Sequence, residues 1–217
     1  MAETASSAAP ERSAERDAAI DAMLPFVAEQ GWTASALRSG LVQAGADPDD
    51  AVLLFPGGVA DMLETFCDLA DRRMEQAALD ECLGALRVSQ RVRAVVAIRL
   101  RQNEPWREPI RRALALMAWP PYAGLAARTL ARTVDSMWHA AGDTSADFSW
   151  YTKRGLLAAV YSTTLLFWLR DYSDDQQDTL AFLDRRLAGV ARIGRLRSRL
   201  GGRPTGNQGR SASVPTV

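Results

Sequence analysis

The sequence predicts an all-α protein of about nine helices, and two observations support this. Apolar residues recur with the spacing of a helix in several separate stretches, whereas the alternation typical of a β-strand is not found. Hydrophobic residues make up 47% of the 217 positions, enough to bury a substantial core. We therefore expect a helical domain with short loops and no internal repeat.

Helical spacing can be followed along the whole chain. Its clearest sets are Ile20, Met23, Leu24 and Val27; Val92, Val95, Val96 and Leu100; Ile110, Leu114 and Met117; Leu130, Val134, Met137 and Trp138; and Leu157, Val160, Tyr161, Thr164, Leu165 and Trp168. The positions of capping and helix-breaking residues also agree with helices. Thr33 can cap one helix, Pro120-Pro121 separates two, and Asp147 can cap a helix that runs to about Asp171.

The first 65 residues have a recognisable layout. A helix is followed by a second over Thr33 to Ala44, a turn at Gly45 to Pro48 and a short helix over Asp49 to Phe55. Pro56-Gly57-Gly58 then leads into the next helix. This layout resembles the DNA-binding head of TetR-type repressors, in which the short helix would enter the major groove.

The charges of this head do not suit DNA. Affinity for DNA comes from Lys and Arg that neutralise phosphates. The segment around the short helix instead carries Asp47, Asp49, Asp50 and Asp61, and nothing basic lies between Arg38 and Arg72. We therefore expect a degenerate helix-turn-helix that binds no nucleic acid. A TetR-type repressor that responds to a lipid remains the alternative.

Few residues could support catalysis. His139 is the single histidine, whereas a di-iron bundle needs paired Glu-x-x-His motifs and a zinc site needs several His or Cys ligands. Cys67 and Cys82 lack CxxC spacing, which favours free thiols in a reducing compartment. No phosphate-binding loop is found. We predict a protein that works by binding, with no catalytic residue, metal or cofactor.

The C-terminal part of the chain is basic. From Arg185 onward there are eight arginines and no acidic residue. Leu183, Val190, Ile193, Leu196 and Leu200 share one arc of a helix, and Arg185, Arg192, Arg195 and Arg199 form a stripe beside it. Such a helix can lie in the interface of an anionic membrane. A docked or dimer-interface helix with a solvated Arg face is the open alternative. The predicted membrane-binding residues are Arg192, Ile193, Arg195, Leu196, Arg199 and Leu200.

The predicted helix from Ser149 to Leu169 is apolar around most of its circumference, as expected for a helix in the core or beside an apolar cavity. Its longest uncharged run, Gly155 to Leu169, is shorter than the roughly 20 residues that span a bilayer. Trp150 and Tyr151 lie next to charged residues, a composition typical of protein-interaction sites. Buried aromatic residues are the alternative.

Two motifs give this region a specific resemblance. Asp135 to Asp143 reads D-x-x-W-x-x-A-G-D, and Asp147 to Arg154 reads D-x-x-W-Y-T-K-R. Together with Leu157 to Thr164, Asp171-Tyr172-Ser173 and Thr179 to Arg186, they resemble the lipid-binding accessory proteins of ubiquinone (coenzyme Q) biosynthesis. The resemblance extends more loosely back through Gly31-Trp32-Thr33 and Phe55-Pro56-Gly57, and covers about residues 16 to 190.

The resemblance implies a TetR-like fold without DNA binding, a homodimer, and an apolar cavity for an isoprenoid quinone or phospholipid. It also implies a surface patch that docks the di-iron demethoxyubiquinone hydroxylase, and a C-terminal helix that reaches the membrane. The positions matching the patch are Asp135, Met137, Trp150, Tyr151 and Arg154. The candidates for lipid binding are Leu156, Leu157, Val160, Tyr161, Thr164, Leu165 and Trp168.

These considerations divide the chain into five parts. We expect a flexible N-terminus (1–15), a head (16–65), a lipid-binding bundle (66–184), a basic amphipathic helix (185–200) and a disordered tail (201–217). The acidic N-terminus is no transit peptide of the kind found in mitochondrial members. We therefore expect a cytoplasmic protein associated peripherally with the inner membrane of a bacterium.

Overall fold

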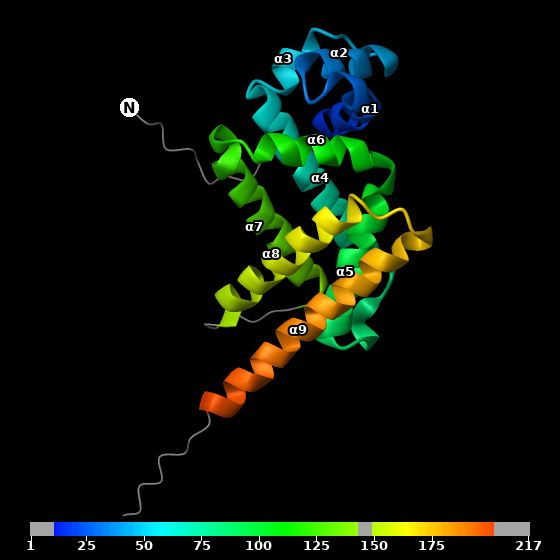
Figure 1. Ribbon diagram of the computed structural model, residues 1–217. Helices are drawn as coiled ribbons and strands as arrows, with labels where there is room; N and C mark the ends of the chain where they lie inside the picture. Colours follow the sequence, from blue (N-terminus) through cyan, green and yellow to red (C-terminus); the bar gives the residue numbers. More distant parts are fainter. Residues whose placement is uncertain (1–10, 143–148, 202–217) are drawn as a thin grey trace, which may run out of the picture.

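The computed structural model describes residues 11–142 and 149–201, with backbone alone at 149–150, 191 and 193–201. Within these residues the chain is all-helical, as predicted (Figure 1). The α-helices are α1 (Ala14–Gln30), α2 (Ala34–Gln43), α3 (Asp50–Leu54), α4 (Gly58–Asp80), α5 (Val88–Asn103), α6 (Arg107–Met117), α7 (Ala123–Ala140), α8 (Ser149–Trp168) and α9 (Gln177–Gly201). Short 3-10 helices occupy Leu83–Ala85, Glu104–Trp106, Pro120–Tyr122 and Asp174–Gln176.

Helices α1 to α3 form the head, at the top of Figure 1. The hydroxyl of Thr33 accepts a hydrogen bond from the Ala36 amide at 3.2 Å, which confirms the predicted cap of α2. Helices α1 and α2 pack backbone against backbone at Gly40, where a Cβ atom would come within 2.6 Å of the Ala22 backbone. Only glycine therefore permits this crossing.

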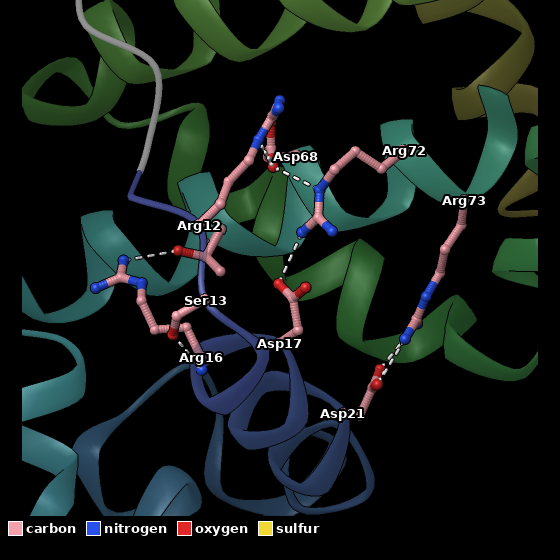
Figure 2. Close-up of polar contacts among 9 residues, drawn as sticks. Arg12, Ser13, Arg16, Asp17, Asp21, Asp68, Arg72 and Arg73 are labelled. Carbon is pink, nitrogen blue, oxygen red and sulfur yellow. Dashed lines mark hydrogen bonds and ion pairs between the residues drawn. The ribbon is translucent and has the colours of Figure 1, made fainter. Parts of the chain in front are cut away.

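Helix α4 belongs to both parts of the molecule. It begins in the head at Gly58 and continues without a break to Asp80, so no loop separates a head ending at residue 65 from the bundle. Ion pairs connect it to α1, as Figure 2 shows. Arg72 contacts Asp17 at 2.7 Å and Arg73 contacts Asp21 at 2.6 Å. The head is thus attached to the bundle by a shared helix and by side-chain contacts.

Residues 11–15 differ from the expected flexible N-terminus. Ser13 caps α1 by accepting a hydrogen bond from the Arg16 amide at 3.1 Å. Arg12 forms an ion pair with Asp68 of α4 at 2.6 Å (Figure 2). These contacts tie the segment to α4. The rest of the predicted N-terminus (1–10), the predicted tail from 202 onward and the predicted cap Asp147 lie outside the described residues.

Helices α4 to α9 form the bundle. The indole N–H of Trp32 donates to the Pro109 carbonyl at 2.9 Å and joins the head to α6. Helix α9 packs on α8 and α5 near its start, then projects beyond the bundle (Figure 1). It is continuous across the predicted boundary at residues 184 and 185. No helix within the described residues is both long and apolar enough to span a membrane.

Candidate functional site

A cavity of about 230 Å³ lies among α4, α5, α6, α7 and α8. Most of its wall is apolar, and the lining residues are Phe66, Cys67, Arg99, Asn103, Ile110, Ala113, Leu114, Met117, Ala126, Thr129, Leu130, Thr133, Tyr161, Ser162, Leu165 and Leu166. Five helices contribute to this wall. The cavity is therefore a property of the packed bundle and not of any one amphipathic segment.

The structure brings two predicted lipid-binding residues, Tyr161 and Leu165, to this cavity. Leu156 and Val160 instead line a separate groove of about 290 Å³ between α8 and α9. The remaining three, Leu157, Thr164 and Trp168, are buried but do not line the cavity. Their assignment to lipid binding stays a prediction, because α8 is enclosed by several helices and only one of its buried faces meets this cavity.

Most lining residues come from helices that the sequence did not single out. Arg99 carries the clearest signal among them, because a charged residue follows Val92, Val95 and Val96 in an apolar periodic stretch. Residues of this type are almost never fully buried unless they are paired. A charge within an apolar helical pattern is therefore the feature that could have indicated the site.

A buried ion pair lies beside the cavity, because Arg99 of the lining is paired with Asp71. Arg99 and Asp71 are 4% and 5% exposed, and Arg99 Nη1 lies 2.8 Å from Asp71 Oδ1. The hydroxyl of Thr133 donates to Asp71 Oδ2 at 3.0 Å. Burial raises the pKa of Asp71 to about 6, against the opposing effects of Arg99 and Thr133. The pair therefore does not fully recover the free energy of removing its charges from water.

Two other lining residues could be suspected of acid–base or nucleophilic chemistry. Burial raises the pKa of the Cys67 thiol to about 12, so that the thiol stays protonated and is a poor nucleophile. Burial also raises the pKa of Tyr161, although the positive charge of Arg99 opposes this effect. Both groups are neutral at pH 7. The lining thus offers polar recognition and no activated nucleophile.

The predicted docking patch is partly assembled on the surface. Arg154 Nε donates to Asp135 Oδ1 at 2.8 Å, which joins α8 to α7. The side chain of Tyr151 is 75% exposed nearby on α8. Lys153 Nζ lies 5.9 Å from the centre of the Trp138 ring, within cation–π range. The patch therefore combines an exposed aromatic ring with a fixed pair of opposite charges.

Met137 is not part of this surface. Its side chain is fully buried, because it lies on the same face of α7 as Val134 and packs in the core. Its assignment to a partner-facing patch was wrong. The side chain of Trp150 lies outside the described residues, so its assignment stays a prediction.

The C-terminal half of α9 provides the backbone for the predicted membrane-binding residues. The helix continues to Gly201, and the side chain of Arg192 is exposed. The side chains of Ile193, Arg195, Leu196, Arg199 and Leu200 lie outside the described residues. Contact with a membrane therefore stays a prediction.

Comparison with known proteins gives this geometry a context. Residues 123–194 match the COQ9 family model. The chain is 34% identical over 182 residues to the rat (Rattus norvegicus) and to the human protein named "Ubiquinone biosynthesis protein COQ9, mitochondrial". Each match covers 81% of this chain but only 58% and 57% of the relative. The chain thus spans less than two thirds of the length of these relatives.

A solved structure has the same fold. A TetR transcriptional regulator from Nitrosomonas europaea superposes with a TM-score of 0.67, over 82% of this chain and 99% of that chain. The sequence identity is 23%, so this similarity concerns the fold. The head, the shared helix α4 and the helical bundle are accordingly TetR-like, as the sequence predicted. The sequence relatives and the match over residues 123–194 make the chain similar to the COQ9 family.

Proposed function

We propose that this protein acts in ubiquinone biosynthesis as a non-catalytic lipid-binding accessory protein. It binds an isoprenoid quinone intermediate in the cavity and presents it to the di-iron demethoxyubiquinone hydroxylase at the membrane surface. One observation carries the proposal: a largely apolar cavity enclosed by five helices in a chain whose relatives are named ubiquinone biosynthesis proteins. The cellular setting we propose is bacterial, with the protein a homodimer at the inner membrane.

The physical advantage of such a protein follows from the hydrophobic effect. Each CH₂ group kept from water stabilises a bound lipid by about 0.8 kcal/mol. The cavity of about 230 Å³ is smaller than the roughly 300–1,000 Å³ of a typical small-molecule site. It can therefore hold only part of a polyprenyl lipid. The rest of the chain must pass between helices, or remain in the bilayer.

Lipid binding is tested by mass spectrometry of organic extracts from gently purified protein. We expect a co-purifying isoprenoid quinone or phospholipid in stoichiometric amount. A matched preparation of Leu130→Arg, which places a charge in the cavity wall, should contain much less lipid. Repeated absence of lipid from wild-type protein would overturn this part of the proposal.

Docking is tested at the exposed tyrosine. Tyr151→Ala should weaken capture of the hydroxylase while the melting temperature stays unchanged, because the side chain is 75% exposed. Tyr172→Ala is the matched control, since Tyr172 is 84% exposed at the other end of α8, outside the patch. Equal capture by both variants would exclude Tyr151 from the docking surface.

Membrane contact is tested by removing the residues that follow Gly189. We expect the shortened protein to bind liposomes more weakly, with the larger loss on anionic lipid. Equal binding by the full-length and shortened proteins would refute a role for this segment.

The alternative, a lipid-responsive repressor, is favoured by the TetR-like fold alone. The electrostatics oppose it, because Asp47, Asp49 and Asp50 are exposed around the start of α3. A repressor requires salt-sensitive DNA binding. A gel-shift titration in which no DNA is bound at low salt would exclude a repressor function.

A further inference from the structure

Helix α3 presents apolar side chains to solvent at the top of Figure 1. Ala51 is buried and Leu54 packs against the core, so these two positions face inward. Val52 and Leu53 face outward and are 61% and 79% exposed. They are adjacent on a helix of only five residues. The outer side of α3 is therefore apolar, and no described residue covers it.

The acidic residues beside these apolar side chains are not neutralised by the fold. Asp47, Asp49 and Asp50 are exposed and form no ion pair with any described residue. The acidic residues between α1 and α4 differ, because four aspartates there are each paired with an arginine, namely Asp17, Asp21, Asp61 and Asp68. We call Asp47, Asp49, Asp50, Val52 and Leu53 the α3 face. Its negative charge can be complemented only by a partner.

The opposite end of the molecule has complementary chemistry. Helix α9 continues to Gly201 and points away from the head (Figure 1). In its sequence, Ile193, Leu196 and Leu200 share one arc beside a stripe of arginines. A basic amphipathic helix of this kind fits an apolar surface with an acidic border. Since α9 leads away from its own head, residues 189–201 of one molecule can reach the α3 face of another molecule but not their own.

The distribution of charge favours this contact between copies. The chain has 26 basic and 26 acidic residues, so no net charge opposes association. Residues 1–65 nevertheless carry eleven acidic residues against three arginines, whereas the sequence from Arg185 onward has eight arginines and no acid. Two molecules placed head to tail bring opposite charges together. Two heads, or two C-terminal ends, would repel each other.

We propose that the α3 face binds residues 189–201 of a second copy of this chain. Val52 and Leu53 contact the apolar arc of that segment, and the three aspartates neutralise its arginines. The contact is head to tail, so each molecule keeps one unused surface and further copies can add. The same segment carries the proposed membrane contact. Binding to the α3 face and binding to a membrane therefore exclude each other. The inference goes beyond the proposed function and requires no lipid in the cavity.

The test is sedimentation velocity of the full-length protein over a range of concentrations, without lipid. We expect the average mass to rise beyond that of a dimer at low salt and to fall again at high salt, where the charges are screened. Leu53→Lys places a positive charge in the α3 face and should raise the dissociation constant of the assembly about tenfold. Its melting temperature should not change, because the side chain is 79% exposed.

Leu79→Lys is the matched control, since Leu79 of α4 is 70% exposed and lies outside the α3 face. It should assemble like wild type. A synthetic peptide of residues 189–203 should dissolve the wild-type assembly by occupying the α3 face. Vesicles of anionic lipid should also dissolve it by binding the C-terminal segment, whereas vesicles of neutral lipid should not.

The outcomes decide each part of the proposal. Wild-type protein that forms nothing larger than a dimer at low salt would overturn it. Equal assembly by Leu53→Lys and Leu79→Lys would exclude the α3 face, and an assembly that resists the peptide would exclude the C-terminal segment. Assembly that persists on anionic vesicles would overturn the competition with the membrane. None of these results bears on lipid in the cavity, which the organic extracts test separately.

Discussion

The head and the bundle each bury an arginine, and the two side chains have different surroundings. Arg16 of α1 contacts the Leu54 carbonyl, Asp61 and the Thr65 hydroxyl, and its guanidinium lies 4.5 Å from the centre of the Phe55 ring. Arg99 of α5 has the buried Asp71 beside it and a cavity on its other side. Arg16 therefore fastens α1 to α4, whereas Arg99 brings a charge to a space that a ligand can enter.

The difference shows how to interpret buried charge. A buried ion pair is weak evidence for stability, because desolvation offsets much of the attraction. In the head, Arg16 is supported by several acceptors and by an aromatic ring. In the bundle, the raised pKa of Asp71 indicates incomplete compensation, and the pair lies at the cavity. A charge that is poorly compensated by the fold is the better candidate for function.

The largest expected effect is at Asp71. Asp71→Leu leaves the Arg99 guanidinium buried without its carboxylate, and Arg cannot be neutralised by losing a proton. We expect the free energy of unfolding to fall by about 3–5 kcal/mol, measured by urea denaturation. The double variant Asp71→Leu/Arg99→Leu removes both charges and should regain most of this loss. If Asp71→Leu were as stable as wild type, Asp71 would not be needed to compensate the buried charge of Arg99.

The matching change in the head should have a smaller effect. Asp61→Leu removes the carboxylate beside Arg16, but Thr65 and the Leu54 carbonyl remain as acceptors. Asp61 is also 21% exposed, so water can reach the site. We expect a loss of about 2 kcal/mol in the same urea experiment. A loss equal to that of Asp71→Leu would remove the distinction between the two arginines.

A third aspartate, Asp171, extends the comparison to a carboxylate held by uncharged donors. Burial raises its pKa, but the hydroxyl and amide groups of Ser173 and Thr179 outweigh this effect and lower the pKa to about 2. Its contribution to stability is therefore complete above pH 4 and is lost as the pH falls towards 2. Asp171→Asn should reduce the free energy of unfolding by about 1 kcal/mol at pH 7. Unfolding curves of both proteins should converge near pH 2.

The smallest effect is expected at the exposed pairs between α1 and α4 (Figure 2). Arg73 and Asp21 have 48% and 41% of their side chains exposed, so water and salt screen their attraction. Arg73→Ala should change the free energy of unfolding by less than about 1 kcal/mol. High salt should reduce even this difference. A loss comparable to that of Asp61→Leu would show that these surface pairs share in holding the head.

The sequence predicted the local features of the fold, such as helix caps and turns, which depend on residues close together in the chain. Thr33 caps α2, and the short α3 follows the turn at Gly45, because both features are decided within a few positions along the chain. Met137 belongs to the same apolar period as Val134, and the structure buries its side chain completely. Its placement in the surface patch came from the family resemblance and was wrong. Local periodicity was the better guide at this position.

The composition of the cavity could not be predicted in the same way. Phe66 of α4, Asn103 of α5 and Leu114 of α6 meet there because five helices converge. Periodicity shows that a residue is buried, but not whether it faces another side chain or an empty space. For the same reason Leu157 and Leu165, both buried on α8, have different roles.

The packing at Gly40 bears on which residues of the head can be substituted without altering its fold. Its missing side chain, together with the buried Leu37 and Trp32, fixes the crossing of α1 and α2 from within. None of these contacts involves the exposed residues around α3. The helix arrangement of a TetR-like head is therefore compatible with acidic as well as with basic residues around α3. In this head the packing of the helices does not determine the charge of the surface, so a TetR-like shape does not imply a surface that binds DNA.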